Sequence, residues 1–308
     1  MSVSPEVAVA AERISKSYGS FRAVRDLTFE IHRGEIFALL GPNGSGKTTT
    51  IRMILDILKP DTGTIRVLGA PLTDATKNRI GYLPEERGLY RNVPVLEMMM
   101  YLGALKGMSR SEAKRRSLEL LEQLQLADFA RKKVSELSKG MQQKVQFAVT
   151  VLHKPDLIIV DEPFSGLDPL NTLVIKDLLL DFQRAGGAVV MSTHQMHQVE
   201  ELAERLLMIS RGEQKLYGSV DAIRRQFARH AIVVEGEGNW ASLPGVERVE
   251  THENGRHDTT LFLTPEATAD DVLAAIAQSR SMTIRRFELA VPSLNDIFIQ
   301  VVEGEAHE

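Results

Sequence analysis

The sequence predicts an α/β fold with a mainly parallel core sheet and a helical insertion, followed by a small α+β domain. Through the first two thirds of the 308 residues, short apolar segments alternate with helical patterns. This alternation is typical of a parallel sheet flanked by helices. A helix-rich stretch at about 89–137 interrupts it, and strand-like segments dominate after residue 220. We therefore expect one domain at 1–219 and a second at 220–308.

Three apolar segments are the expected core strands. They are IFALL (36–40), DLIIVDEP (156–163) and AVVMSTH (188–194). A Gly-rich loop and a helix TTTIRMILDIL (48–58) follow the first of them. In the insertion, Ser109 and Glu112 have the spacing of a capping box at the start of a helix.

The C-terminal segment has its own pattern. Residues 229–238, 248–264 and 282–291 have the composition of strands, and 267–279 that of a helix. A last helix is expected from Ser293, with Asp296 placed to complete its N-cap.

Composition excludes several function classes. The chain has no cysteine, so disulfides, thiolate zinc sites and cysteine nucleophiles are excluded. The formal net charge of −4 does not indicate nucleic acid as a partner. No apolar run approaches the roughly 20 residues that span a bilayer, and the N-terminus has no secretory pattern. We expect a protein that is soluble by itself, with any membrane role supplied by a partner.

A phosphate-binding loop is the first chemical motif. Residues 41–48 fit G-x-x-x-x-G-K-[ST] between a strand and a helix. Glycines let the backbone N–H groups surround phosphate oxygens, and the helix N-terminus favours the same anion. Lys47 is expected to reach the β- and γ-phosphates, and the Thr48 hydroxyl to bind Mg²⁺. The candidate residues are Gly41, Pro42, Asn43, Gly44, Ser45, Gly46, Lys47, Thr48 and Thr49.

Two acidic residues end the strand at 157–161. Because the carboxyl ends of parallel strands face the ligand, Asp161 is expected to hold Mg²⁺ and Glu162 to polarise the attacking water. A solvated acidic turn is the alternative for this pair alone. Together with the phosphate loop, the pair indicates a nucleoside triphosphatase.

Further segments, in order, resemble the nucleotide-binding subunits of ABC transporters over about residues 8–220. The resemblance implies a P-loop NTPase fold, ATP and Mg²⁺. It implies that Tyr18 stacks on adenine, that His194 contacts the γ-phosphate, and that Asp168 of SGLD (165–168) lies at a dimer interface. A half-buried strand tyrosine is the alternative for Tyr18.

The segment LSKGM (137–141) resembles the family's LSGGQ signature in altered form. Ser138 can cap a helix through QQKVQFAVTVL, and in the family this helix start binds the γ-phosphate held by the opposite subunit. Ser138 and Gly140 keep the pattern, whereas Lys139 and Met141 depart from it. An ordinary capped helix is the alternative for this segment alone.

The segment IGYLPE (80–85) resembles the Q-loop, with Glu85 where the family usually has glutamine. A carboxylate is an acceptable Mg²⁺ ligand. YLPEERGLY, LSKGMQQK and the C-terminal extension together resemble ATPases of the ABC-2 exporter class, closest to sodium- or drug-extrusion subunits. This subgroup implies a cytoplasmic chain, peripheral at the inner face of the cell membrane through the permease.

The expected mechanism is ATP hydrolysis at composite sites in a head-to-tail dimer that drives a separate transmembrane permease. The apolar run Val95 to Leu105 is either a docking groove for that permease or, as methionines at 98–100 favour, core packing. Two other functions compete. A soluble ABC ATPase acting on DNA or ribosomes lacks support, because the chain has neither long coiled coils nor a second cassette. A weakly hydrolysing regulatory module is favoured by Glu85 and the altered signature, and disfavoured by Glu162 and His194.

Overall fold

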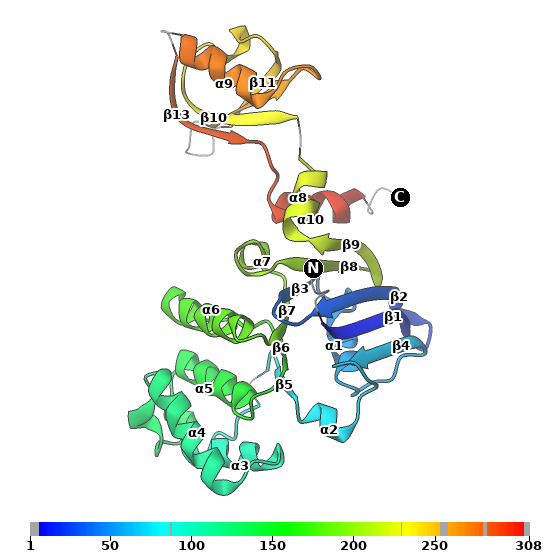
Figure 1. The fold of residues 1–308 in the computed structure, drawn as a ribbon, viewed down its shortest axis with the longest axis vertical. Coiled ribbons are helices and arrows are strands. Elements are labelled where there is room, and N and C mark those ends of the chain that lie inside the picture. The colour runs from blue at the N-terminus through cyan, green and yellow to red at the C-terminus, as the bar shows by residue number, and fades with distance from the viewer. Residues whose placement is uncertain (1–5, 87, 229, 253–257, 280–281, 305–308) are drawn as a thin grey trace. The chain divides into compact units, whose positions relative to one another are not determined.

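The computed structural model describes residues 6–86, 88–228, 230–252, 258–279 and 282–304 (Figure 1). The chain divides into two compact units, Met1–Val220 and Asp221–Glu308. The α/β fold class predicted from the sequence is confirmed. The first unit contains a mixed, mainly parallel sheet with flanking helices, and the second contains a separate antiparallel sheet.

The core sheet of the first unit has the order β5-β6-β7-β3-β8-β9. Its strands are β3 (Ile36–Leu40), β5 (Ile80–Leu83), β6 (Leu157–Asp161), β7 (Ala188–Thr193), β8 (Arg205–Ser210) and β9 (Glu213–Ser219). Only β9 runs antiparallel to its neighbour. The three core strands expected from the sequence are β3, β6 and β7. Every residue of these three is buried, because a central parallel strand is covered on both faces.

Two layers cover this sheet. Helices α5 (Lys139–Val151) and α6 (Pro169–Arg184) lie on one face, and α1 (Lys47–Ile54) lies on the other (Figure 1). A second sheet, with the order β2-β1-β4, packs beyond α1 and shares its apolar core. Its antiparallel strands are β1 (Val7–Tyr18), β2 (Phe21–His32) and β4 (Thr62–Val67). Sequence reasoning did not anticipate this sheet.

Helix α1 is shorter than the helix predicted over residues 48–58. It ends at Ile54, and Asp56 adopts a positive φ of 60°. The N–H groups of Ile57 and Leu58 both bond to the carbonyl of Arg52. The chain therefore leaves the helix within the apolar run, so periodicity alone placed the end too late.

The helical insertion contains α3 (Val95–Leu105), α4 (Arg110–Gln123) and the short turns η1 (Ala127–Phe129) and η2 (Val134–Glu136). As expected, Ser109 caps α4 by accepting the N–H of Glu112. Met98 and Met99 are buried in a core shared with α5, so core packing is confirmed for them. Tyr101 and Leu105 of α3 are instead 52% and 62% exposed.

The second unit has the sheet order β11-β12-β10-β13, antiparallel throughout. Its strands are β10 (Ala231–Glu237), β11 (Val246–His252), β12 (Asp258–Leu263) and β13 (Thr283–Leu289). Its helices are α8 (Val220–Gln226), η3 (Trp240–Ser242), α9 (Ala269–Gln278) and α10 (Leu294–Gly304). With η3 after the first strand and α9 after the third, the order from β10 to β13 is that of a ferredoxin-like split βαβ unit.

Predictions for this unit agree closely with its elements. The segment 248–264, predicted as a strand, contains two strands, β11 and β12. Its residues 253–257 lie outside the described residues. Arg229, in the predicted strand at 229–238, also lies outside them. Ser293 and Asp296 cap α10 reciprocally, because each side chain accepts the other's backbone N–H.

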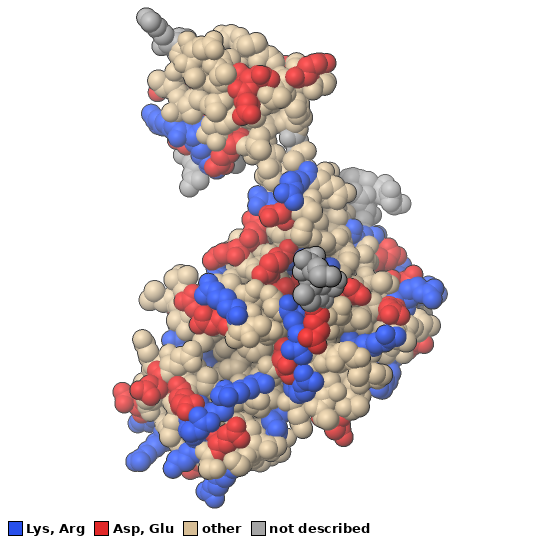
Figure 2. Space-filling view, viewed as in Figure 1, with Lys and Arg blue, Asp and Glu red and all other residues tan. Residues whose placement is uncertain are grey.

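In the part of the chain that the structure describes, no helix is long and apolar enough to cross a membrane. Figure 2 shows acidic and basic side chains interspersed over the visible face of the first unit.

Candidate functional site

A pocket of about 300 Å³ opens at the carboxyl ends of β3, β6 and β7. It brings together residues from five separate parts of the sequence. Its lining is Tyr18, Phe21, Ala23, Asn43, Gly44, Gly46, Lys47, Thr48, Thr49, Glu85, Asp161, Glu162 and His194. The remaining predicted loop residues, Gly41, Pro42 and Ser45, belong to the same turn. Ser138, Gly140 and Asp168 do not line this pocket.

Two glycines explain how the loop fits between β3 and α1. A Cβ on Gly41 would lie 2.1 Å from the carbonyl oxygen of Ile209, and one on Gly46 would lie 2.4 Å from that of Ala23. Both also have positive φ, at 150° and 115°. The buried hydroxyl of Ser45 has no hydrogen-bond partner. The turn is therefore a tight backbone cradle with an unused polar group, which fits an anionic ligand.

Lys47 is the first residue of α1 and is buried. Its Nζ donates to the carbonyl oxygens of Gly41 at 2.8 Å and Pro42 at 3.1 Å. Burial lowers the pKa of Lys47, and the negative Glu162, Asp161 and Glu85 oppose that effect. The loop thus holds the ammonium group in place beside the carboxylates.

Asp161 and Glu162 lie at the end of β6, and both are buried. Burial raises the pKa of Asp161, the nearby Glu85 and Glu162 raise it further, and Ser192 and Lys47 oppose the rise. A buried carboxylate whose charged form is disfavoured is typical of a site that takes up a cation.

The Glu162 carboxylate accepts three hydrogen bonds from the end of β7. The Thr193 hydroxyl donates at 3.1 Å, the backbone N–H of His194 at 3.1 Å, and His194 Nδ1 lies at 2.7 Å. An ionised carboxylate only accepts, so Nδ1 carries the proton in this contact. The His194 side chain itself is 58% exposed and reaches the pocket.

Tyr18 and Phe21 face each other across the two-residue turn between β1 and β2. Both rings line the pocket, with 46% and 61% of their surface exposed. Tyr18 is the last residue of β1 and is about half exposed, so its position fits both the stacking role and the strand tyrosine considered as its alternative. Sequence reasoning missed Phe21; the aromatic pair flanking Gly19-Ser20 was the available signal.

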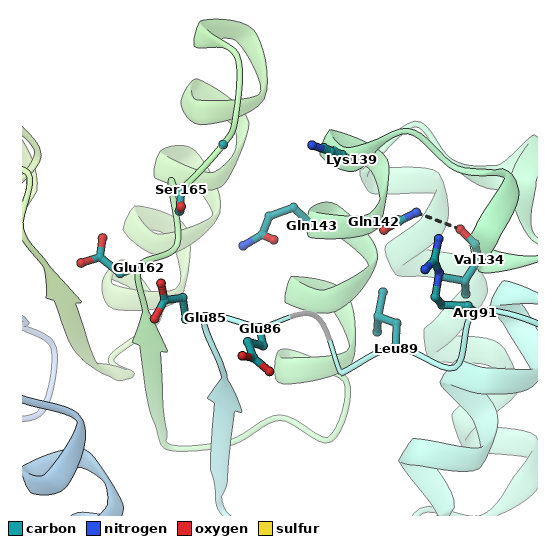
Figure 3. A pocket seen from close by; sticks show the side chains of 11 residues that line it. Glu85, Glu86, Leu89, Arg91, Val134, Lys139, Gln142, Gln143, Glu162 and Ser165 are labelled. Carbon is teal, nitrogen blue, oxygen red and sulfur yellow. Dashed lines mark hydrogen bonds between the residues drawn. The ribbon is translucent and has the colours of Figure 1, made fainter.

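A larger cavity of about 690 Å³ lies on the other side of Glu85 and Glu162, which line both spaces. Figure 3 shows these two carboxylates side by side at the ends of the neighbouring strands β5 and β6. Lys139 extends over the cavity from the start of α5 toward Ser165 (Figure 3).

The signature segment and Asp168 form a separate group at the starts of α5 and α6. Ser138 is the N-cap of α5, as expected, and accepts the N–H of Met141. Asp168 is the N-cap of α6 and also accepts the side-chain amide of Asn171 at 2.6 Å. A Cβ on Gly140 would lie 2.4 Å from that amide nitrogen. Gly140 and Asp168 both lie against Asn171, and neither they nor Ser138 line the pocket of the phosphate loop of their own chain.

A known relative covers this whole architecture. The chain is 40% identical over 297 residues to the uncharacterized ABC transporter ATP-binding protein YhaQ of Bacillus subtilis, covering 96% of this chain and 99% of YhaQ. The chain belongs to the ABC transporter ATP-binding proteins. Residues 24–165 match the ABC transporter family, whose ATPase members bind ATP, generally with Mg²⁺. Residues 218–302 match the C-terminal domain of DrrA1-3-like ATP-binding proteins.

Two further comparisons describe this ABC protein. It is 37% identical over 222 residues to the Nod factor export ATP-binding protein I of Paraburkholderia xenovorans, covering 71% of this chain and 73% of that protein. The solved structure of an ATP-binding subunit of an ABC transporter superposes with a TM-score of 0.66 at 34% identity. That match covers 71% of this chain and 93% of the other.

Proposed function

We propose that this chain hydrolyses MgATP in a head-to-tail pair of identical copies and so drives export through a separate ABC-2 type permease. The observation that carries the proposal is the single pocket that joins the phosphate loop to Asp161, Glu162 and His194. Phosphoryl transfer to water needs an anion cradle, a metal-binding carboxylate and a group that orients the water. All three face one space here.

ATP would lie along the pocket with its base at the β1–β2 turn. Tyr18 would stack on adenine, and residues Gly41 to Thr49 would surround the phosphates with backbone N–H groups. On nucleotide binding, Lys47 Nζ would exchange its carbonyl partners for β- and γ-phosphate oxygens. The exchange is short-range, because the ammonium group is already held at the loop.

The residues present fit a magnesium ion. Thr48, Asp161 and Glu85 supply hydroxyl and carboxylate oxygens, the ligand type that Mg²⁺ prefers. Among the described residues, no group of three or more His, Cys, Asp or Glu side chains could hold a metal ion. Because Mg²⁺ is usually bound by one or two carboxylates together with substrate phosphates, it would bind here with the phosphate oxygens and would neutralise charge that develops on them.

Glu162 would accept a hydrogen bond from the attacking water. Its three bonds to the end of β7 fix the carboxylate and leave lone-pair capacity for that water. With Nδ1–H donated to Glu162, His194 can donate from Nε2 to the γ-phosphate only as an imidazolium ion. The pair therefore ties the orientation of the water to the presence of the phosphate.

The second half of each site would come from the partner copy. Ser138 and Gly140 would present the start of α5 to the γ-phosphate, and Asp168 would lie at the shared interface. Their separation from their own phosphate loop supports this assignment, since neither of the two signature residues lines the pocket of its own chain.

The export direction rests on relatives. The matched C-terminal domain is named for DrrA1-3-like proteins, and one relative is named for Nod factor export. We infer a cytoplasmic chain held at the inner face of the membrane by a permease, with that permease and a second copy as partners and no nucleic acid. Cargo contacts would then belong to the permease.

The test measures the mass in solution of Glu162→Gln with and without MgATP. We expect a shift from monomer to dimer with MgATP, abolished by Lys47→Ala, and ATP turnover in the wild type that Glu162→Gln loses. A chain that stays monomeric with bound MgATP would contradict the two-copy site. A dimer that forms equally without ATP would place the association elsewhere in the chain.

A further inference from the structure

Three glutamines lie in the first three turns of α5, and two of them share one face. Gln143 and Gln146 are three residues apart, so their side chains leave the helix in similar directions. Both are buried, with 5% and 4% of their surface exposed. Neither belongs to the signature segment described above.

Both amides reach the loops that carry the acidic residues. Gln146 Nε2 donates to the carbonyl oxygen of Pro84 at 3.2 Å and makes a longer contact of 3.5 Å with that of Glu86. These carbonyls flank Glu85 on both sides. Gln143 Nε2 donates at 3.2 Å to the carbonyl of Pro163, the residue after Glu162. Each carboxylate shared by the two cavities therefore has its backbone held by one amide of the same helix.

Gln146 is poorly suited to a purely packing role. Its Oε1 is buried and has no hydrogen-bond partner. An unpaired buried acceptor destabilises the fold, whereas an apolar side chain of similar shape at this position would leave no such group. Buried polar groups with this cost call for a reason other than stability.

We propose that Gln143 and Gln146 are positioning residues, through which α5 sets the placement of Glu162 and Glu85. The proposal rests on the proposed hydrolysis at this site. Because α5 begins at Lys139 with Ser138 as its N-cap, a displacement of its N-terminus would move both carboxylate loops together through these two amides. Figure 3 shows Gln143 extending from α5 toward the loop of Glu162 and Ser165.

The neighbouring Gln142 provides a matched control. It turns the opposite way in Figure 3, and its Nε2 donates to Val134 at 3.2 Å and Leu137 at 3.0 Å. Gln142→Met therefore removes the same chemical group from the same helix without touching either carboxylate loop. The working variant is Gln146→Met, which keeps the side-chain length and removes the amide.

The first measurement is ATP turnover of the full chain as a function of Mg²⁺. For Gln146→Met we expect kcat to fall on the order of 10-fold and the half-saturating Mg²⁺ concentration to rise, since small misplacements at a reacting centre cost up to about 100-fold. Gln142→Met should keep the wild-type Mg²⁺ dependence. In a Glu85→Gln background, Gln146→Met should add no further Mg²⁺ shift, because the group it positions is gone.

The second measurement does not depend on turnover. Hydrogen exchange of the backbone at 80–86 in the nucleotide-free chain should be faster in Gln146→Met than in wild type and Gln142→Met. Electron paramagnetic resonance of Mn²⁺, added with a non-hydrolysable ATP analogue, should show weaker metal binding to Gln146→Met than to the wild type. Unchanged exchange, or an equal Mg²⁺ shift with and without Glu85, would overturn the positioning role. If the wild-type chain shows no ATP turnover, the proposed function is overturned instead. The hydrogen-exchange measurement would still test whether Gln146 holds the backbone at 80–86.

Discussion

Glu162 combines two unusual features in one residue. Its φ is 47°, in the left-handed region that side chains with a Cβ seldom adopt. Its carboxylate is buried and receives donors from Thr193 and His194, which lie 31 and 32 residues further along the chain. Backbone strain of this kind costs on the order of 1–3 kcal/mol and persists where the surroundings determine it. The turn at Pro163, held by Gln143, and the end of β7 supply those surroundings.

The aromatic pair at the β1–β2 turn gives the first prediction. Phe21→Ala and Tyr18→Ala should each weaken ATP binding by about 1–3 kcal/mol, the usual worth of a base stacked on an aromatic ring. Titration calorimetry with the Glu162→Gln chain measures the affinity. Tyr90→Ala, an exposed aromatic outside the pocket, is the control. If Phe21→Ala binds ATP as the parent chain does, Phe21 has no part in base binding.

At the scale of elements, α5 and α6 meet where Gly140 touches Asn171. A methyl group on Gly140 would displace the Asn171 amide from Asp168. We expect Gly140→Ala to destabilise the first unit by about 1–3 kcal/mol, as overpacking does. In an Asn171→Ala background the clash is gone, and the same change should become stabilising through helix propensity.

The comparison needs the wild type, Gly140→Ala, Asn171→Ala and the double variant. Their unfolding free energies in urea, followed by circular dichroism, measure the interaction between the two positions. The sign of the Gly140→Ala effect should differ between the two backgrounds. An identical effect in both would show that Asn171 does not connect the signature segment to Asp168.

The junction of α5 with β5 gives a pH prediction. His153 Nε2 lies 3.2 Å from the carbonyl oxygen of Ile80. Burial lowers the pKa of His153 from 6.5 to about 4, and the positive Lys106 and Arg116 also lower it. The folded chain therefore resists protonation: its stability is full above pH 6.5 and is lost as the pH falls toward 4.

Between pH 7 and pH 5 the unfolding free energy of the wild type should fall. In His153→Gln we expect this fall to be smaller by about 2 kcal/mol. The unfolding free energy in urea at the two pH values, for the wild type and the variant, measures this. His197→Gln, a change at an exposed histidine of α7 (Met196–Leu202), is the control. Equal pH dependence in the wild type and His153→Gln would show that His153 does not resist protonation in the folded chain.

At the scale of the whole molecule, each unit has its own apolar core. Trp240, the single tryptophan of the chain, is buried in the core of the second unit with Ile232 and Leu261. The pocket with the phosphate loop lies entirely in the first unit. Tryptophan fluorescence therefore reports on the second unit, whereas most of the helical signal comes from the first.

We expect MgATP to raise the midpoint temperature of unfolding of Glu162→Gln when it is followed by circular dichroism. The midpoint temperature followed by tryptophan fluorescence should stay unchanged. Ligand at about 100 times its Kd stabilises the unit that binds it by about 2.7 kcal/mol. Thermal scans with both probes, with and without MgATP, make the comparison. Two transitions that coincide and shift together would show that the units unfold as one.

Sequence reasoning anticipated the core strands, the phosphate loop and the caps at Ser138 and Ser293, because each depends on neighbouring residues. It placed the end of α1 too late, since the turn at Asp56 is held by bonds to Arg52 rather than by apolar periodicity. It missed the sheet β2-β1-β4, in which β1 pairs with β4 across as many as 58 residues, from Val9 to Val67, and in which the registers are irregular.

The phosphate loop, and the later strand that ends in two acids, could be predicted from the sequence alone. Both are contiguous motifs whose chemistry follows from local spacing. Three contacts became visible only in the folded chain: His194 bonds to Glu162, Phe21 lines the pocket beside Tyr18, and Gln146 reaches the loop of Glu85. These contacts join segments far apart in the chain, and their geometry is set by the pairing and packing of strands and helices, which no local pattern encodes.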